Sequence, residues 1–417
     1  MSALAVLHGC NAKPLFLGSV IAERMSVWFN TCNFPKTEVG SGEKIRAPIQ
    51  TLENLEMKKT LVALAALAAT SAFAQSSVTL YGQFDAGVYS LSDVGTAKKD
   101  ATVFGDGATF SNILGFRGTE DIGGGLKAGF DFQTDVQTNN GGMNNSGLFR
   151  RQANGNIAGG FGELKIGLTT NPIIATNGLL MPVSGNSVST ATSSALGYAD
   201  FYTKNALTYT SPAMMGLVAQ FQKGMSNNLD SGSAGSVTAW SLNYTAGPLA
   251  IRAAAQDREQ GGVSSSSNAS TSAIGTANTA GFNKKGSIMG ASYKIGNITV
   301  AYASLKTENA TALNGARTER KGNQMGVGYT TGAWTLGSTL TKAEDSKLTN
   351  FQARYALSKR TNVIGTYGIA DNSTKGLVNF APLAFNTGTA PAAIVTDYAG
   401  ATNVKTTGFG VGLTHSF

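Results

Sequence analysis

The chain has 417 residues and a net charge of +8 at pH 7, without any run of lysine or arginine, which argues against a nucleic-acid-binding surface. Both cysteines and one of two histidines precede residue 75, so a disulfide scaffold, a cysteine-based metal site and a multi-histidine site are excluded for the remainder. Charged residues are only 13%, against about 25% in typical domains, and 52 glycines accompany 9 prolines, which favours a sheet protein whose hydrophobic surface is dispersed.

Residues 57–74 have the three-part layout of a secretory signal peptide. Met57-Lys58-Lys59 supplies a positive start, residues 61–69 form an apolar core, and Ala72-Phe73-Ala74 is a small-x-small cleavage site. The apolar core is too short to span a bilayer, which takes about 20 residues. We therefore expect cleavage between Ala74 and Gln75, and a mature protein of residues 75–417.

Residues 1–56 have two interpretations. They are either translated from a start codon placed too early, because a signal peptide behind 56 residues is poorly placed to act, or a genuine extension of unknown role. They show no clear periodicity, and we predict no fold for them.

Strict alternation of apolar and polar residues begins directly after Gln75. Val78, Leu80, Phe84 and Val88 share one face of residues 77–90, and polar side chains, Asp85 among them, occupy the other. A dozen alternating residues are long for a soluble strand and suit a tilted membrane strand of about 9–11 residues.

The alternation recurs along the chain and predicts sixteen strands. They lie at 77–90, 108–118, 124–138, 147–157, 161–169, 205–211, 215–224, 236–246, 248–258, 286–295, 297–307, 321–331, 333–343, 347–357, 361–370 and 405–417. The fourth and the sixth have the weakest patterns.

The predicted connections alternate between short and long. Short ones contain Gly or Pro, as at Gly247, Gly296 and Gly332, whereas 91–107, 170–204, 258–285 and 371–404 are long and polar. An even number of strands with short turns at one rim and long loops at the other is typical of an outer-membrane barrel. A barrel also removes free sheet edges, which lipid does not tolerate.

Aromatic residues occur near the predicted strand ends. Phe417 ends the last strand, which we expect to close the barrel against the first, with its ring at the membrane interface. Tyr89, Tyr209, Tyr293, Tyr329 and Trp334 suit an aromatic girdle, although some of them are equally compatible with packing inside the barrel.

Several segments, taken in order, resemble the trimeric general-diffusion porins of Gram-negative outer membranes, in the branch typical of beta-proteobacteria. The resemblance covers nearly all of residues 75–417. It is carried by Ser77-Val78-Thr79-Leu80-Tyr81-Gly82, by Gly115-Phe116-Arg117-Gly118-Thr119-Glu120-Asp121 with Ile122-Gly123-Gly124-Gly125-Leu126-Lys127-Ala128, by Arg151-Gln152-Ala153, by Gly160-Phe161-Gly162-Glu163-Leu164-Lys165-Ile166-Gly167, by Asn205-Ala206-Leu207-Thr208-Tyr209-Thr210-Ser211-Pro212 and by Val411-Gly412-Leu413-Thr414-His415-Ser416-Phe417.

The resemblance implies an all-β fold, a 16-stranded antiparallel transmembrane β-barrel with short periplasmic turns and long extracellular loops. It implies a homotrimer and a third loop, here about 170–204, folded into the lumen. It further implies contact with outer-membrane lipid and lipopolysaccharide, and assembly by the barrel-assembly machinery through the C-terminal strand. The sequence departs from the family where Gly167 is followed by Leu168-Thr169-Thr170 in place of the frequent Gly-Arg-Gln, and Asp200 is the only acid of the loop.

A pore of this kind selects by width and by charges at its constriction. On the polar faces we predict the bases Arg117, Lys127, Arg151, Lys165, Arg252 and Arg354, and the acids Asp85, Asp131, Glu163 and Asp200, as pore-lining residues. Each charge is alternatively paired with a neighbour in a wide, wet part of the barrel. We therefore predict passive diffusion of small hydrophilic solutes and ions through the channel. The excess of bases predicts a mild preference for anions.

Other functions receive less support from the sequence. Gly408-x-Gly410-x-Gly412 superficially resembles a dinucleotide fingerprint, but it lies inside a strand without a following helix. His415 beside Ser416 suits an interfacial strand end better than a catalytic pair. We therefore expect no enzymatic activity, cofactor or metal. A substrate-specific channel stays open as an alternative; an adhesin and a barrel enzyme are less favoured.

Overall fold

The computed structural model describes residues 77–95, 97–106, 111–143, 147–183, 201–226, 236–259, 282–311, 317–372 and 403–417. The chain divides into two units, Met1–Ala68 and Ala69–Phe417, and all described residues belong to the second. The predicted extension, the signal peptide with its cleavage site at Ala74 and Gln75, and Asp200 lie outside the described residues.

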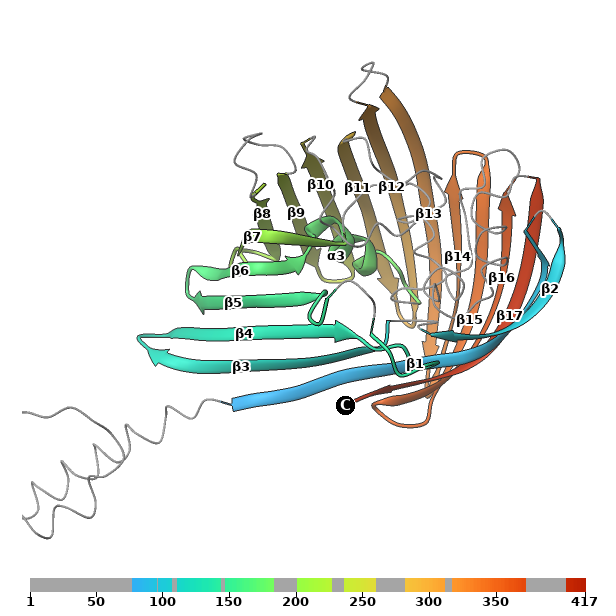
Figure 1. The fold of residues 1–417 in the computed structure, drawn as a ribbon, viewed down its shortest axis with the longest axis horizontal. Helices are drawn as coiled ribbons and strands as arrows, with labels where there is room; N and C mark the ends of the chain where they lie inside the picture. The colour runs from blue at the N-terminus through green and yellow to red at the C-terminus, as the bar shows by residue number, and fades with distance from the viewer. Residues whose placement is uncertain are drawn as a thin grey trace, which may run out of the picture. The chain divides into compact units, whose positions relative to one another are not determined.

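The described residues form seventeen antiparallel strands in one sheet and one helix. The strands are β1 (Ser77–Val94), β2 (Lys99–Asp106), β3 (Ile113–Gly123), β4 (Leu126–Asp135), β5 (Gln152–Gly159), β6 (Gly162–Thr170), β7 (Tyr202–Thr210), β8 (Leu217–Gly224), β9 (Val237–Ala246), β10 (Leu249–Arg258), β11 (Phe282–Ile295), β12 (Ile298–Thr311), β13 (Arg317–Thr331), β14 (Trp334–Ala343), β15 (Ser346–Ala356), β16 (Thr361–Asn372) and β17 (Val404–Ser416), and the helix is α3 (Pro172–Leu179). In Figure 1, β1 lies between β3 and the C-terminal strand β17.

The sheet closes on itself because β1 has partners on both of its edges. One edge pairs with β17, from Gln83↔Ser416 to Ser92↔Thr407. The other edge pairs first with β3 and then with β2. Strands β2 and β3 thus share one position in the wall, which makes sixteen positions and confirms the predicted 16-stranded antiparallel barrel.

Strand β2 corrects the prediction that residues 91–107 form a long loop. The second half of β1 extends past the end of its pairing with β3, and β2 supplies the backbone hydrogen-bonding partners for that half. Unsatisfied backbone groups are costly in a barrel wall, so this edge is filled although its sequence is polar.

The two faces of the wall follow the predicted alternation. On β1, Val78 is 66% exposed and Val88 is 55% exposed on the outer face, whereas Asp85 and Tyr89 are buried on the inner face. Exposed apolar side chains alternate in the same way on the other strands. This outer apolar surface is the one that lipid would cover.

Tight turns connect consecutive strands at one rim. Three of these turns have two residues, and the first of the two is a glycine with a φ near +55°: Gly247, Gly296 and Gly332. Of the predicted girdle residues, Tyr209, Tyr293, Tyr329 and Trp334 are exposed near strand ends at this rim. Tyr89 is not part of the girdle, because it is 3% exposed and faces inward. It lies four positions after Asp85 in β1, and residues an even number of positions apart in a strand share a face.

Helix α3 packs against the inner face of the wall. It follows β6 directly and contacts β8, β9, β10 and β11, and Figure 1 shows it inside the curve of these strands. Ile173 and Leu180 join Ala254 of β10 and Ile288 of β11 in a buried apolar cluster. The burial of these apolar side chains stabilises the helix inside the barrel. Within the described part of the chain, no helix is long and apolar enough to cross a membrane.

Candidate pore-lining site

The strand registers place the predicted charges of the strands on the inner face. Arg117 of β3 lies opposite Asp131 of β4, and Lys165 of β6 lies opposite Thr208 of β7. The inward residues of this set are Asp85, Arg117, Lys127, Asp131, Glu163, Lys165, Arg252 and Arg354. Arg151 lies just before β5 and reaches the same face through its contacts.

A first polar cluster joins β1, β3 and β4. The hydroxyl of Tyr81 donates to Oδ1 of Asp131 at 2.5 Å and accepts from Nε2 of Gln133 at 3.1 Å. The guanidinium of Arg117 lies 5.0 Å from the centre of the Tyr81 ring, within the range of a cation–π contact. Arg117 and Asp131 thus share one aromatic partner on the inner wall.

A second cluster surrounds the carboxylate of Asp135 at the end of β4. Arg151 donates from Nη1 to Oδ1 of Asp135 at 2.8 Å and from Nε to Gln133 at 2.9 Å. Arg150 forms an ion pair with the other carboxylate oxygen. The guanidinium of Arg151 also lies 5.4 Å from the centre of the Tyr202 ring. Two arginines around one acid leave this cluster with a net positive charge.

Asp135 and Arg150 were not among the predicted site residues. Asp135 continues the inward alternation of Asp131 and Gln133, so its face was available from the sequence. Arg150 stands outside the regular strands, where alternation gives no orientation.

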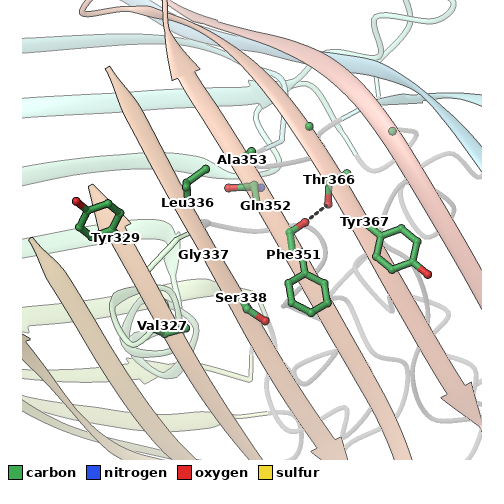
Figure 2. A pocket seen from close by; sticks show the side chains of 12 residues that line it. Val327, Tyr329, Leu336, Gly337, Ser338, Phe351, Gln352, Ala353, Thr366 and Tyr367 are labelled. Carbon is green, nitrogen blue, oxygen red and sulfur yellow. Dashed lines mark hydrogen bonds between the residues drawn. The ribbon is translucent and has the colours of Figure 1, made fainter. Parts of the chain in front are cut away.

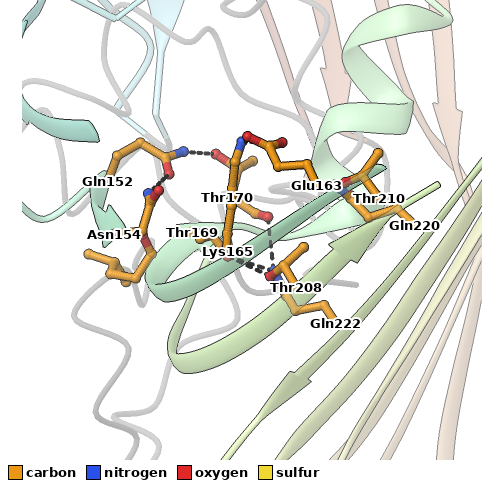
Figure 3. Close-up of polar contacts among 11 residues, drawn as sticks. Gln152, Asn154, Glu163, Lys165, Thr169, Thr170, Thr208, Thr210, Gln220 and Gln222 are labelled. Atoms are coloured by element: carbon orange, nitrogen blue, oxygen red, sulfur yellow. Dashed lines mark hydrogen bonds and ion pairs between the residues drawn. The ribbon is translucent and has the colours of Figure 1, made fainter. Parts of the chain in front are cut away.

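A layer of amides and hydroxyls joins β5, β6, β7 and β8 beside α3 (Figure 3). Nε2 of Gln222 donates to the hydroxyls of Thr169 at 2.8 Å and Thr208 at 3.1 Å. Nε2 of Gln152 donates to the hydroxyl of Thr170 at 2.6 Å. On β6, the strand of Thr169 and Thr170, Lys165 pairs with Glu163 at 3.1 Å. This layer fixes the end of β6, where the chain turns inward.

Asn171 anchors α3 at the point where the chain leaves the wall. Its side chain is fully buried, and its Oδ1 caps the helix by accepting from the amide of Ile173 at 3.0 Å. Its Nδ2 donates to Oε1 of Gln256 on β10 at 2.6 Å and to Thr203 at 3.3 Å. Asn171 therefore caps the helix and ties it to β7 and β10.

Charges are sorted by face on β10–β15. Within the described residues of these strands, Asp257, Glu308 and Glu319 are the acids, and all three face outward, where they pair with lysines. The inward bases are Arg252, Arg258, Lys284, Lys294, Arg320 and Arg354. Asp85 of β1 faces the same lumen and interacts electrostatically with Arg354. The inner wall of β10–β15 is therefore positive.

A shallow apolar depression on β13–β17 belongs to the outer face (Figure 2). Tyr329, Leu336, Phe351 and Tyr367 line it, and each is at least 41% exposed. Ser338, a small residue, lies between them. Since these residues lie on the outer face of the wall, the depression does not belong to the inner face. In the described part of the chain, no group of His, Cys, Asp and Glu side chains is arranged to hold a metal ion.

Comparison with known proteins identifies relatives. A family model described as Gram-negative porin matches residues 60–375. The chain is 44% identical over 113 residues to the outer membrane porin protein 32 of Delftia acidovorans, which is 27% of this chain and 31% of that protein. It is 39% identical over 132 residues to an outer membrane porin of Bordetella pertussis, 28% of this chain and 34% of the relative. The aligned stretches thus span about a third of the relatives' length.

Solved structures share the fold over a larger part of the chain. An anion-selective porin from Comamonas acidovorans matches with a TM-score of 0.63 at 22% identity, over 82% of this chain and 100% of that chain. OmpT of Vibrio cholerae matches with a TM-score of 0.57 at 13% identity, over 82% of this chain and 98% of that chain. At these identities the likeness concerns the fold.

Proposed function

The chain belongs to the Gram-negative porin family, as an integral β-barrel of the outer membrane, and from this premise we propose that it forms a water-filled channel. Small hydrophilic solutes and ions would cross it by passive diffusion. Its polar inner face and apolar outer face support this function, because water can fill the lumen while lipid covers the outside. We further propose that the barrel carries out no bond chemistry.

The sorting of charges on β10–β15 carries our proposal of a mild anion preference. The bases Arg117 and Lys165 of the opposite wall each lie close to an inward acid. On β10–β15, Arg252, Arg258, Arg320 and Arg354 face inward, while Asp257, Glu308 and Glu319 face outward. A lumen with this bias concentrates anions. The matching Comamonas acidovorans structure is itself described as an anion-selective porin.

Planar-bilayer recordings test both parts of the proposal. Refolded protein should give ohmic channels, and its reversal potential in a KCl gradient should have the sign of chloride preference. Clear cation selectivity would overturn the anion preference. A conductance near zero in correctly folded protein would overturn the open-channel proposal.

A substrate-specific anion channel is the second candidate, favoured by the inward arginines of β10–β15. The two functions predict different concentration dependences. Flux through a general porin rises in proportion to solute concentration, whereas a channel with a binding site saturates. Chloride, phosphate and small carboxylates, compared over a wide concentration range, decide between them.

We also propose a homotrimer that begins at Gln75 and resides among outer-membrane lipid and lipopolysaccharide. The C-terminal strand, ending in Phe417, would be the segment that the barrel-assembly machinery engages. Cross-linking of protein extracted in mild detergent should give a trimer, and N-terminal sequencing should begin at Gln75. A monomer, or an N-terminus at Met1, would contradict the respective statement.

A further inference from the structure

The segment after α3, residues 180–183, lies flat on the inner wall across β11–β14. A Cβ atom at Gly290 of β11 would lie 2.9 Å from Cδ1 of Leu180, and one at Gly326 of β13 would lie 2.6 Å from Cδ of Pro182. A Cβ atom at Gly337 of β14 would overlap Cγ2 of Val183. The segment is therefore in direct contact with the backbone of the wall.

Three glycines on neighbouring strands form the surface on which this segment rests. Gly326 and Gly328 of β13 meet Pro182, Gly328 and Gly337 meet Val183, and Gly328 and Gly337 are register partners. We call Gly326, Gly328 and Gly337 the glycine seat. A methyl group at Gly326 or Gly337 would lie closer to the segment than Cβ atoms lie to their neighbours in proteins, and one at Gly328 would make tight contacts of 3.0–3.2 Å. A larger side chain must displace either the wall or the segment.

The wall has little freedom to yield at this place. Strands β13 and β14 are paired with each other and with β12 and β15 along most of their length. Moving one strand outward breaks the backbone hydrogen bonds of its neighbours, which lipid cannot replace. A side chain added at the seat should therefore push the segment toward the middle of the lumen.

Arg354 holds the end of the segment against the wall. Its Nη2 donates to the carbonyl oxygen of Val183 at 3.2 Å and to Oε1 of Gln352 at 3.4 Å. Together with Asn171 at the start of α3, it fixes the inward chain at both ends of residues 171–183. A charged donor makes a stronger hydrogen bond than a neutral one.

We propose that the glycine seat and Arg354 set the width of the channel by fixing how closely residues 180–183 approach the wall. The proposal rests on the open-channel function above and assigns a positioning role to Gly326, Gly328, Gly337 and Arg354. Arg354 then contributes its hydrogen bond to pore width in addition to its charge.

Adjacent residues of β14 provide a matched pair of variants. Gly337→Leu places a side chain under Val183, whereas Ser338→Leu places the same side chain on the outer face, in the depression of Figure 2. We expect Gly337→Leu to lower single-channel conductance and the largest sugar admitted in liposome swelling, and Ser338→Leu to leave both unchanged. Unchanged or larger conductance in folded Gly337→Leu channels would overturn the proposal.

Arg354→Lys separates position from charge. Lysine keeps the positive charge but lacks the planar fork of donors. We expect a changed conductance with more open-channel noise, and an unchanged reversal potential. A normal conductance together with normal noise would show that the hydrogen bond to Val183 does not set the width.

A disulfide tests the contact without relying on conduction or on the folding of Gly337→Leu. In a chain with Cys10→Ser and Cys32→Ser, we would combine Val183→Cys with Gly337→Cys. Cβ of Val183 lies 2.9 Å from the Cβ position at residue 337, within about 1 Å of the separation in a disulfide. Mild oxidation should cross-link this pair, while Val183→Cys with Ser338→Cys should stay reduced.

The cross-link distinguishes failure of this inference from failure of the proposed function. Conducting channels without a cross-link would refute the seat and leave the porin function standing. A cross-link in folded protein that does not conduct would refute the open channel and leave the seat standing.

Discussion

Removing the Asn171 side chain should release α3 from the wall while the barrel stays folded. Asn171→Ala deletes the cap of Ile173 and both bonds from Nδ2, to Gln256 and Thr203. An N-cap contributes about 1 kcal/mol, and each buried hydrogen bond contributes about 0.5–1.5 kcal/mol net. The free energy of local opening of α3 should therefore fall by about 2–4 kcal/mol, because three bonds of a fully buried side chain are lost.

Hydrogen exchange measured by mass spectrometry reports this opening directly. The amide of Ala175 is a suitable readout, because it donates to the backbone carbonyl of Asn171 at 3.3 Å, a bond that the variant retains. Since 1.4 kcal/mol is a factor of ten, exchange over α3 should accelerate about 30- to 700-fold. Peptides from β14 serve as an internal reference and should be unaffected.

Asn171→Ser is the matched control. Serine keeps an oxygen that can cap the helix but loses the donors to Gln256 and Thr203, so its exchange should lie between those of wild type and Asn171→Ala. The reasoning would be refuted by unchanged exchange over α3 in Asn171→Ala. Equal effects of alanine and serine would show that the cap contributes nothing.

Three further predictions concern the lumen, the closing strand and the rim. Arg252→Glu should shift the reversal potential toward cation preference, whereas Lys285→Glu on the outer face should not; equal shifts would contradict the sorting of charges. Phe417→Ala should lower the free energy of unfolding in lipid vesicles by about 1–2 kcal/mol. The half-exposed ring of Phe417 packs over Gly82, where the last strand pairs with the first; a stability equal to that of the wild type would refute this prediction. Trp334→Ala should lower the same free energy of unfolding by about 1–2 kcal/mol, because the centre of its ring lies 4.8 Å from that of Tyr355 in an exposed pair at the rim. A loss of stability in detergent but not in lipid would contradict a role in the aromatic girdle.

The wall of the barrel was predictable because each strand has two chemically different environments. A residue such as Val88 must suit lipid while its neighbour in sequence must suit a wet interior, so period two appears in nearly every strand. β2 was missed because Lys99, Asp100 and Gly105 give it the composition of a loop. It forms because β1 leaves an open edge, which is a tertiary requirement.

Some contacts on the inner face follow from residues close together in the sequence, and others join residues that are far apart in it. Arg117 and Asp131 face each other across one hairpin, so the sequence already places them together. The contact between Arg151 and Tyr202 joins residues separated by α3 and the loop, and no alternation reports it. The helical turn of Pro172–Leu179 was likewise predicted only as part of a loop, and its cause is the polar anchor at Asn171.

The glycine seat shows why a strand glycine is hard to interpret from sequence. Gly337 lies on the inner face of β14 with Thr335, Thr339 and Thr341, where it is the position without a side chain. A glycine inside a strand is normally interpreted as a weak position. The reason for it is Val183, more than 150 residues earlier in the chain.

Arg354 illustrates the same limit for charges. From sequence it counts only as one positive charge in the lumen, yet its guanidinium also donates to the carbonyl of Val183. A carbonyl carries no net charge, so this bond orients the arginine without neutralising its positive charge. In our proposal, the same side chain acts on pore width through a short-range hydrogen bond and on selectivity through a long-range field. Because the two effects differ in range, a substitution that preserves charge alters one and spares the other.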